Sequence, residues 1–484
     1  MRRAHHPRRD ALVALSLTTL LAGCAVRGAR PQPDDGRRWL AGDHHVHSRY
    51  SVGWNDSTQP PTPIIAGDAR YPIPRNAEMA RQHGLAWMVS TDHGGPNHSK
   101  VNLELAYPEL RQSRAAVPEL IQFFGMEFDT PAADHSSLII PHSDHEHLDL
   151  AEIERRFAKR EAWPLDYGRD VEPRMLEALR HMEALARRPI VIANHPSRSA
   201  QGLGRYGLDT PAEFRAWHDA APTVAVGMEG APGHQASALN RDGSIDSAGT
   251  RGGYGRHPTM GGFDQMTARL GGLWDAMLGE GRRWWITATS DSHLHWREGG
   301  SDFWPGEYAK TYVLAKRTHD DILDGIRSGR VFVTTGDLVS QVEVVAEASG
   351  ARAATIGGTL TLARRGDVRV TIRVRDPEAP NHAGRRPRVA RIDLIVGDVT
   401  GPAADRTLDV NPTTRVERRF TAADWRADGE WLVMEHVLRD VHHTGYLRVR
   451  GTAGSELEPT PDPKGEDPWS DLWFYANPVF LVIR

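Results

Sequence analysis

The chain has 484 residues, of which 59 are lysine or arginine, 63 are aspartate or glutamate, and one is cysteine. A chain of this length can bury a large core and usually divides into two domains. Its net charge of −4 argues against nucleic acid as a bulk electrostatic partner, and a single cysteine excludes an intrachain disulfide framework.

The first residues are typical of a bacterial export signal. A basic start is followed by the apolar run ALVALSLTTLLA, which is too short to span a bilayer. The run ends in LAGC, which resembles a lipoprotein cleavage box with Cys24 as its lipidated residue. We therefore predict a signal peptide over residues 1–23 and a protein attached by lipid to the membrane of the bacterial cell envelope. The pair Arg8-Arg9 leaves open a twin-arginine export route.

The following residues predict a tether and then an α/β domain. Residues 24–38 are polar and contain several prolines and glycines, as linkers do. From Trp39 onward, apolar strand-like runs alternate with helical patterns, such as the methionines and leucines of residues 175–185. This alternation predicts an α/β barrel of parallel strands over residues 39–338.

A long stretch at residues 230–262 interrupts this pattern. It is rich in glycine, serine and asparagine, and a loop of such length is seldom a mere connection. We interpret it as a loop that contacts substrate at the mouth of the barrel, with a disordered surface loop as the alternative.

The pattern changes to β-structure after Thr335. The run DVRVTIRVRD alternates valine or isoleucine with polar residues, as a half-buried strand does. Similar runs follow, and no long helix is expected between them. Residues 339–484 are therefore predicted to form a smaller, β-sandwich-like C-terminal domain of antiparallel strands.

Histidines and carboxylates border the apolar runs of the barrel region. They are His45, His47, Asp92, His93, Glu127, His135, His195, Asp291 and His293. Imidazole and carboxylate donors suit zinc, manganese or iron, and strand ends of a barrel meet at one mouth. Because an ordinary core does not need so many ionisable groups, we predict a site for two or three divalent metal ions.

Six short segments together resemble the PHP superfamily, the polymerase and histidinol phosphatase domain of metal-dependent phosphoesterases. They are DHHVHS at residues 43–48, STDH at 90–93, GME at 125–127, His135, NHP at 194–196 and SDSH at 290–293. The segment GRVFVTTGD and the β-rich tail are similar to the carbaryl-hydrolase-like branch of these metallohydrolases. The resemblance implies a distorted barrel of about seven β/α units with ligands at the strand ends.

The resemblance also implies a set of ligands for up to three ions. The first ion would be held by His45, His47, Glu127 and Asp291, the second by Glu127, His135 and His195, and the third by His93 and His293. Asp92 would be a further ligand or would orient one. The chain departs from the family because Val52 stands where relatives carry an acidic ligand. Asp56 is the candidate replacement, and otherwise the third site is weak or empty.

Hydrolysis of a small phosphate ester is the activity that these residues favour. Two cations lower the pKa of a shared water and bind phosphoryl oxygens. Arg198 is a candidate clamp for one such oxygen, and His293 or His295 is a candidate general acid; with Asp92, they are the predicted catalytic residues. A carboxyl or carbamate ester hydrolase is one alternative, and a non-catalytic surface lipoprotein that binds a ligand is another.

Four other histidines have weaker claims to the site. His98 could donate a proton or contact substrate, or could be a bystander. His142, His145 and His147 fall outside the ordered series, and we interpret them as part of a solvated loop.

Overall fold

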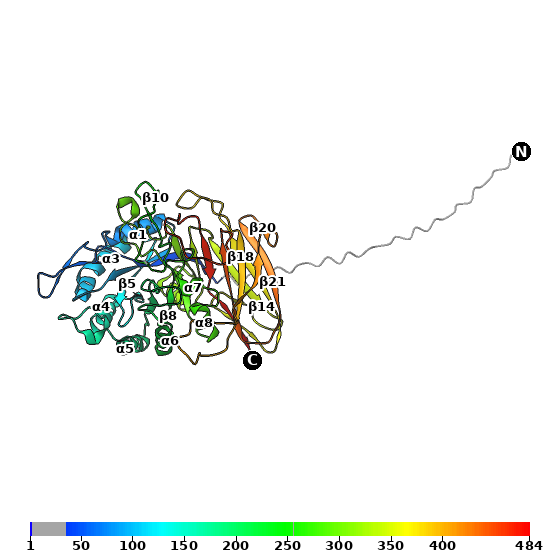
Figure 1. Ribbon diagram of the computed structural model, residues 1–484, viewed down its shortest axis with the longest axis horizontal. Coiled ribbons are helices and arrows are strands. Elements are labelled where there is room, and N and C mark those ends of the chain that lie inside the picture. Colours follow the sequence, from blue (N-terminus) through cyan, green and yellow to red (C-terminus); the bar gives the residue numbers. More distant parts are fainter. Residues whose placement is uncertain (2–34, 255) are drawn as a thin grey trace. The chain divides into compact units, whose positions relative to one another are not determined.

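The computed structural model of the protein describes residue 1, residues 35–254 and residues 256–484. The expected signal peptide, the lipidation site Cys24 and most of the expected tether lie outside the described residues. The chain divides into the units Met1–Asp35 and Gly36–Arg484, and the description below concerns the second unit (Figure 1). Among its described residues, the chain contains no helix that is both long and apolar enough to cross a membrane.

A mixed sheet of 15 strands forms the centre of this unit. The strands of its first part neighbour one another in the order β11-β8-β7-β6-β5-β4-β1-β12-β13. Their bounds are β1 Arg38–Val46, β4 Trp87–His93, β5 Ile121–Asp129, β6 His135–Ile139, β7 Ile190–Ala193, β8 Ala225–Ala231, β11 Trp285–Ala288, β12 Ala309–Ala315 and β13 Val331–Thr335.

The prediction of parallel strands is right for four of the eight neighbouring pairs and wrong for the four pairs that involve β6 or β12. The pairs β1–β4, β4–β5, β7–β8 and β8–β11 are parallel. Strand β6 runs antiparallel to both of its neighbours, and β12 runs antiparallel to β1 and β13. The connection between β5 and β6 is only residues 130–134, which is long enough for a hairpin but too short for the crossover that a parallel pair needs.

The carboxyl end of β11, the outermost strand of this row, approaches the carboxyl end of β1, which lies inside the row. No strand ladder closes a barrel among the described residues. Two backbone hydrogen bonds nevertheless join the ends: Asp291 N donates to His45 O at 3.0 Å, and His47 N donates to Ser292 O at 3.1 Å. The fold is therefore an α/β fold with a large mixed sheet, and β11 approaches β1 where the predicted ligands lie.

Helices pack beside these strands. They are α1 Ile73–Gln82, α2 His98–Val101, α3 Tyr107–Ala116, α4 Glu146–Phe157, α5 Glu172–Glu183, α6 Pro211–Ala220, α7 Gln265–Ala268, α8 Leu273–Gly279 and α9 His319–Arg327. Helix α5 confirms the predicted periodicity, because Met175, Leu179 and Met182 are buried along one face. Helix α6 begins with a capping box formed by Thr210 and Glu213.

The main sheet continues into the C-terminal part of the chain because β13 pairs with β23. Beyond β23 the order is β22-β18-β19, and β24 pairs with both β22 and β16. The bounds are β16 Thr359–Leu362, β18 Arg391–Asp398, β19 Arg415–Phe420, β22 Gly445–Thr452, β23 Trp473–Ala476 and β24 Val479–Ile483. The pair β16–β24 is parallel, which departs from the expected antiparallel arrangement. The sheet thus crosses the boundary that was predicted between residues 338 and 339.

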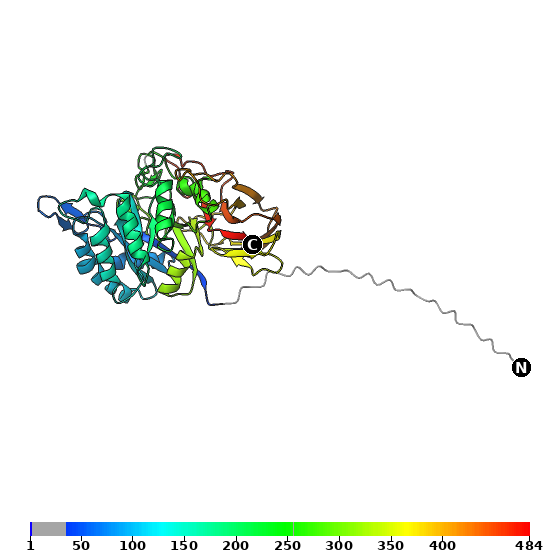
Figure 2. The same ribbon diagram turned by 90° about the horizontal axis from the view of Figure 1, so that it is seen from below.

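A second sheet of five strands lies in the C-terminal part, in the order β15-β14-β17-β21-β20, with every pair antiparallel. The bounds are β14 Gln341–Glu347, β15 Ala354–Thr355, β17 Gly366–Arg375, β20 Arg426–Asp428 and β21 Trp431–Val441. Strand β17 buries Val368, Val370, Ile372 and Val374, as its alternation predicted. Helices α1 to α6 occupy one end of the unit and strands β14, β18 and β21 the other (Figure 2). The two sheets share one hydrophobic core, as a sandwich-like arrangement requires.

Candidate metal centre

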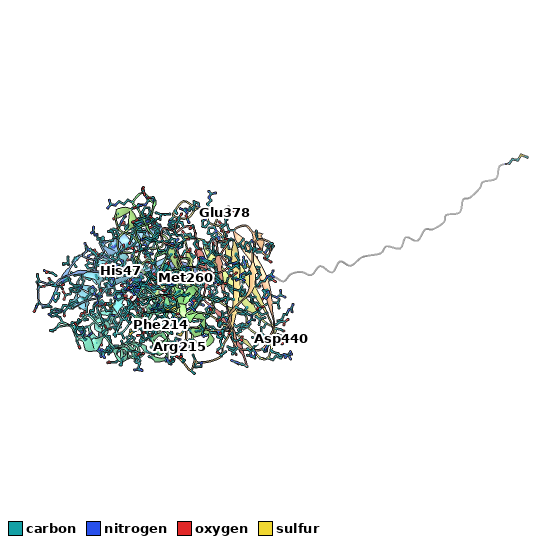
Figure 3. All side chains as sticks on the ribbon, viewed as in Figure 1. His47, Phe214, Arg215, Met260, Glu378 and Asp440 are labelled. Carbon is teal, nitrogen blue, oxygen red and sulfur yellow. The ribbon has the colours of Figure 1, made fainter. Side chains whose placement is uncertain are left out.

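Eight of the nine predicted metal ligands gather at one place in the fold. Their donor atoms form overlapping groups in which all atoms lie within 4.8 Å of one another. The groups are His45, His47 and Asp291; His45, Glu127 and His195; His93, Glu127 and His135; and His47, His93 and His293. His47, which belongs to two of these groups, lies among the N-terminal strands (Figure 3).

The strand ends explain this gathering. His45 and His47 are two residues apart at the end of β1, so their side chains lie on the same face. His93 ends β4, and His195 follows β7. His135 is the first residue of β6 and pairs with Asp129 at the end of β5. Because β6 is reversed, its beginning lies at the same edge of the sheet as the carboxyl ends of its neighbours.

The backbone at two of the ligands is unusual. His195 has a φ of 31° and Asp291 a φ of 49°, and residues other than glycine seldom adopt such conformations. The contacts of these residues hold them there: Asp291 N donates to His45 O, and His195 N donates to Glu229 Oε2 at 2.6 Å. Such local backbone strain is typical of functional sites.

Glu127 lies at the centre of the cluster. Its Oε1 is 2.9 Å from His195 Nε2, 3.2 Å from His45 Nε2 and 3.3 Å from His135 Nδ1. Its Oε2 is 2.7 Å from His93 Nδ1. The two oxygens therefore face different sets of imidazoles, which is the arrangement that a carboxylate needs in order to bridge two cations.

Asp291 provides a second carboxylate on the other side of the cluster. Its Oδ1 lies 3.1 Å from His47 Nε2, 3.3 Å from His45 Nε2 and 3.6 Å from His293 Nδ1. His45 thus faces both Glu127 and Asp291, as the implied first ligand set requires.

Burial and neighbouring charges shift the pKa values of this cluster, in opposite directions at Glu127 and His45. Burial raises the pKa of Glu127, but the surrounding histidines, His135 foremost, hold it well below its usual value. Burial lowers the pKa of His45, but three carboxylates, Asp291 foremost, raise it well above its usual value. Burial and the neighbouring His293 lower the pKa of His47 well below its usual value. The cluster therefore holds its carboxylates ionised and divides its histidines between charged and neutral forms.

The donor atoms fit divalent metal ions. Glu127 Oε2, His93 Nδ1 and His195 Nδ1 are buried without any hydrogen-bond partner. The first two lie only 2.7 Å apart yet are not aligned for a hydrogen bond. Buried polar atoms without partners are costly, and a cation between Glu127 Oε2 and His93 Nδ1 would satisfy these two atoms. Imidazole and carboxylate donors in this number suit zinc, manganese or iron.

Asp92, the ninth predicted ligand, belongs to none of the groups. Its carboxylate accepts hydrogen bonds from Ser48 N at 2.6 Å, Ser48 Oγ at 2.8 Å and Ser51 Oγ at 3.1 Å. Ser51 Oγ lies 2.7 Å from His47 Nδ1 and accepts from His93 N at 3.0 Å. Of the two roles predicted for Asp92, this geometry supports orientation of the ligands and does not support ligation or direct catalysis.

Two of the other predicted catalytic residues are engaged elsewhere. Arg198 donates through Nε and Nη2 to Asp134 at 3.1 and 2.7 Å, so much of its hydrogen-bonding capacity is used inside the protein. His295 is 2% exposed and lies 2.8 Å from Glu307 through its Nε2, and its Nδ1 accepts from a backbone N–H. The geometry therefore does not support His295 as a general acid.

His293 keeps a position suited to proton transfer. It is 24% exposed, its Nδ1 lies 3.0 Å from Asp291 O, and its Nε2 faces outward to Asp68. His98, in contrast, is buried between Glu154 and Tyr50 O with both ring nitrogens engaged. His142, His145 and His147 belong to none of the candidate metal groups. His142 and His145 precede α4 in an exposed loop, as predicted. The prediction is wrong for His147, which lies in the first turn of α4 and stacks on Tyr107.

The sequence did not indicate three residues that support the centre. Glu229 is fully buried in β8, and its Oε1 lies 2.6 Å from His45 Nδ1. Asn194 Nδ2 donates to Glu127 Oε1 at 3.2 Å. Asp68 Oδ2 lies 3.6 Å from the Nε2 atoms of both His93 and His293. A glutamate near the end of the apolar run TVAVGMEG was the signal that could have revealed Glu229.

The segment at residues 230–262 packs beside the centre. Residues 231–239 are buried, and so is Arg251. Arg251 donates to the backbone oxygens of Pro232 and Ser290, the second of which precedes Asp291. This packing favours the interpretation of the segment as part of the site over that of a disordered surface loop, and its contact with substrate stays a prediction.

No protein-family model matches the chain, and no curated protein matches it.

Proposed function

We propose that this protein is a metal-dependent hydrolase that cleaves small phosphate mono- or diesters. The observation that carries the proposal is the position of Glu127, whose two oxygens face five buried or half-buried imidazoles at the ends of four strands. The resemblance to the PHP superfamily supports the same activity. Divalent ions bound here would lower the pKa of a water and neutralise charge on a phosphoryl group.

The cluster of candidate ligands has an enclosed side and an open side. His45 and His47 are fully buried, whereas His93 and His293 are 20% and 24% exposed. A substrate would therefore approach along His93 and His293. We assign His45, His47 and Asp291 to a first ion, His135 and His195 to a second, and Glu127 to both.

His293 is the residue that we assign to proton transfer. Burial lowers its pKa, but Asp291 and two further aspartates raise it above its usual value. An imidazole whose pKa is raised holds its proton more readily and can give it to a leaving oxygen. Its exposed ring edge places that proton on the open side, where the leaving group would depart.

Hydrolysis of carboxyl or carbamate esters is a second candidate activity. The ion pair between Arg198 and Asp134 favours it. Asp134 neutralises this arginine through two hydrogen bonds, so the open side has less positive charge than a dianionic phosphate would require. A neutral ester needs no such cation.

The proposal is tested with the purified protein and its Glu127→Gln variant. Metal content and the rates on p-nitrophenyl phosphate, bis(p-nitrophenyl) phosphate and p-nitrophenyl acetate are measured on the same samples. Phosphoester turnover that is lost both on chelation and in the variant would support the proposal. Turnover of the acetate alone would favour the second candidate, and less than one metal ion per chain after reconstitution would contradict both.

The lipid anchor and the cell-envelope location are further proposals, and they rest on residues 1–24 of the sequence. Mass spectrometry of the N-terminal peptide from the membrane fraction tests them, because diacylglyceryl-modified Cys24 has a distinct mass.

A further inference from the structure

Asp68 faces the two most exposed histidines of the metal centre with a single oxygen. Its Oδ2 lies 3.6 Å from His93 Nε2 and 3.6 Å from His293 Nε2. These distances are too long for hydrogen bonds. Two bonds of about 2.1 Å to one cation, at a tetrahedral angle, place the donor atoms about 3.4 Å apart. Each of these two distances therefore suits a pair of ligands on a shared ion.

A short hairpin brings Asp68 to this position. Strand β2 (Gly53–Asn55) pairs with β3 (Thr62–Ile64). After the hairpin, the N–H groups of Asp68 and Ala69 both donate to Ser51 O at 3.3 Å. The chain thus leaves the metal centre at Ser51 and returns to the same residue seventeen positions later, at Asp68.

The hairpin is closed by direct contact between two glycines. A Cβ atom on Gly67 would lie 2.4 Å from Gly53 N and 2.7 Å from Gly53 Cα, so no larger residue fits at position 67 without moving this backbone. Ser51, to which the hairpin returns, has its Oγ 2.7 Å from His47 Nδ1. The position of Asp68 is therefore coupled to the ligands through one serine.

We infer that Asp68 is the carboxylate ligand of a third cation, held together with His93 and His293. This inference rests on the proposed function but changes one part of it: a cation on His293 Nε2 would take the place of the proton that His293 gives to the leaving oxygen. It replaces the expectation for Asp56, which is exposed in the turn between β2 and β3, and it accounts for Val52, which is buried and cannot ligate.

The chemistry of this third site differs from that of the enclosed ligands. Among the described residues, the ion pairs of Asp68 are those with His93 and His293, so no lysine or arginine competes with a cation for its charge. Asp68 is 43% exposed, whereas Glu127 is 1% exposed. A third ion here would therefore be more accessible to solvent and substrate than an ion held by the enclosed ligands.

The experiment counts Mn²⁺ ions and measures their dissociation constants by isothermal titration of the metal-free protein. The variants are Asp68→Asn, the control Asp56→Asn on the same hairpin, and Asp68→His, which keeps a metal-binding side chain. We expect three ions in the wild type and in Asp56→Asn. In Asp68→Asn the weakest of the three should bind at least 10-fold more weakly, and Asp68→His should restore it. Equal melting temperatures in chelator would show that every variant is folded.

The outcomes separate this inference from the proposed function. Three ions with unchanged dissociation constants in Asp68→Asn would overturn the role of Asp68. Two ions in the wild type and in every variant would also overturn it, while the proposed hydrolase would stand on Glu127. Less than one ion in the wild type would overturn both.

Discussion

Replacing Glu229 with glutamine should weaken metal binding while leaving the fold intact. Glu229 is fully buried, and its Oε1 lies 2.6 Å from His45 Nδ1. Its Oε2 accepts from His195 N at 2.6 Å. The carboxylate keeps a proton on His45 Nδ1, which leaves Nε2 free to bind a cation. Glutamine keeps the size of the side chain but loses its charge and one of its acceptor oxygens.

The expected size of the effect follows from these contacts. Burial raises the pKa of Glu229, but His45 lowers it below its usual value, so the carboxylate is charged where it meets the ring. A hydrogen bond to a charged group contributes about 1.5–3 kcal/mol, which corresponds to a factor of about 10 to 100 in affinity. Loss of an outer hydrogen bond to a metal-binding histidine typically has an effect of this size.

A competition titration of Zn²⁺ against a chromophoric chelator measures the effect. The matched control is Glu154→Gln, because Glu154 is also fully buried and lies 2.7 Å from the ring of a histidine, His98, which belongs to none of the metal-binding groups. The control should lower the free energy of unfolding without changing the affinity for zinc. An affinity in Glu229→Gln within twofold of the wild type, or an equal loss in the control, would refute the reasoning.

Three further predictions concern the competition between protons and metal at His135, the orientation of the ligands by Asp92, and the buried ion pair of Arg448. Burial lowers the pKa of His135, but Glu127 raises it, to about 9 overall. A cation must therefore displace a proton from this ring at lower pH, so metal affinity should rise from pH 6 to about 9. A flat profile in competition titrations would contradict this. Asp92→Ala should weaken metal binding about 10-fold by the same assay, whereas an unchanged affinity would exclude an orienting role. Arg448→Ala should lower the free energy of unfolding by about 3–5 kcal/mol, because Asp275 would stay buried without its ion-pair partner. Urea unfolding measures this loss, and the metal content should not change. A loss under 1 kcal/mol would contradict the prediction.

The ligands could be predicted because each borders an apolar run, and the ends of buried strands lie together in an α/β fold. The same reasoning could not separate Asp92 from His93. These residues are adjacent in β4, and neighbouring side chains in a strand point to opposite faces. His93 faces Glu127, whereas Asp92 faces Ser48 on the other side. Which of these two side chains faces the candidate ion site depends on how β4 lies in the sheet. The order of the residues does not give it.

The supporting residues were harder to predict for a related reason. Glu229 lies in the run AVGMEGA, where one glutamate among apolar residues has no periodicity of its own. Asp68 acts through the return of a hairpin to Ser51, and the two histidines that it faces lie 25 and 225 positions later in the chain. Such contacts arise from tertiary packing, which local patterns do not describe.

The predicted direction of β6 is wrong, although its candidate ligand His135 lies with the other candidate ligands. His135 stands at the beginning of its apolar run, whereas the other ligands stand at or after the ends of theirs. A strand that brings its first residue to the edge where neighbouring strands end must run antiparallel to them. The connection over residues 130–134 is too short for a helical crossover, which gives the same direction independently. The requirement that the candidate donors gather at one edge of the sheet is therefore a stronger constraint on topology than the alternation of strands and helices. It gives the reversal of β6 from the position of His135.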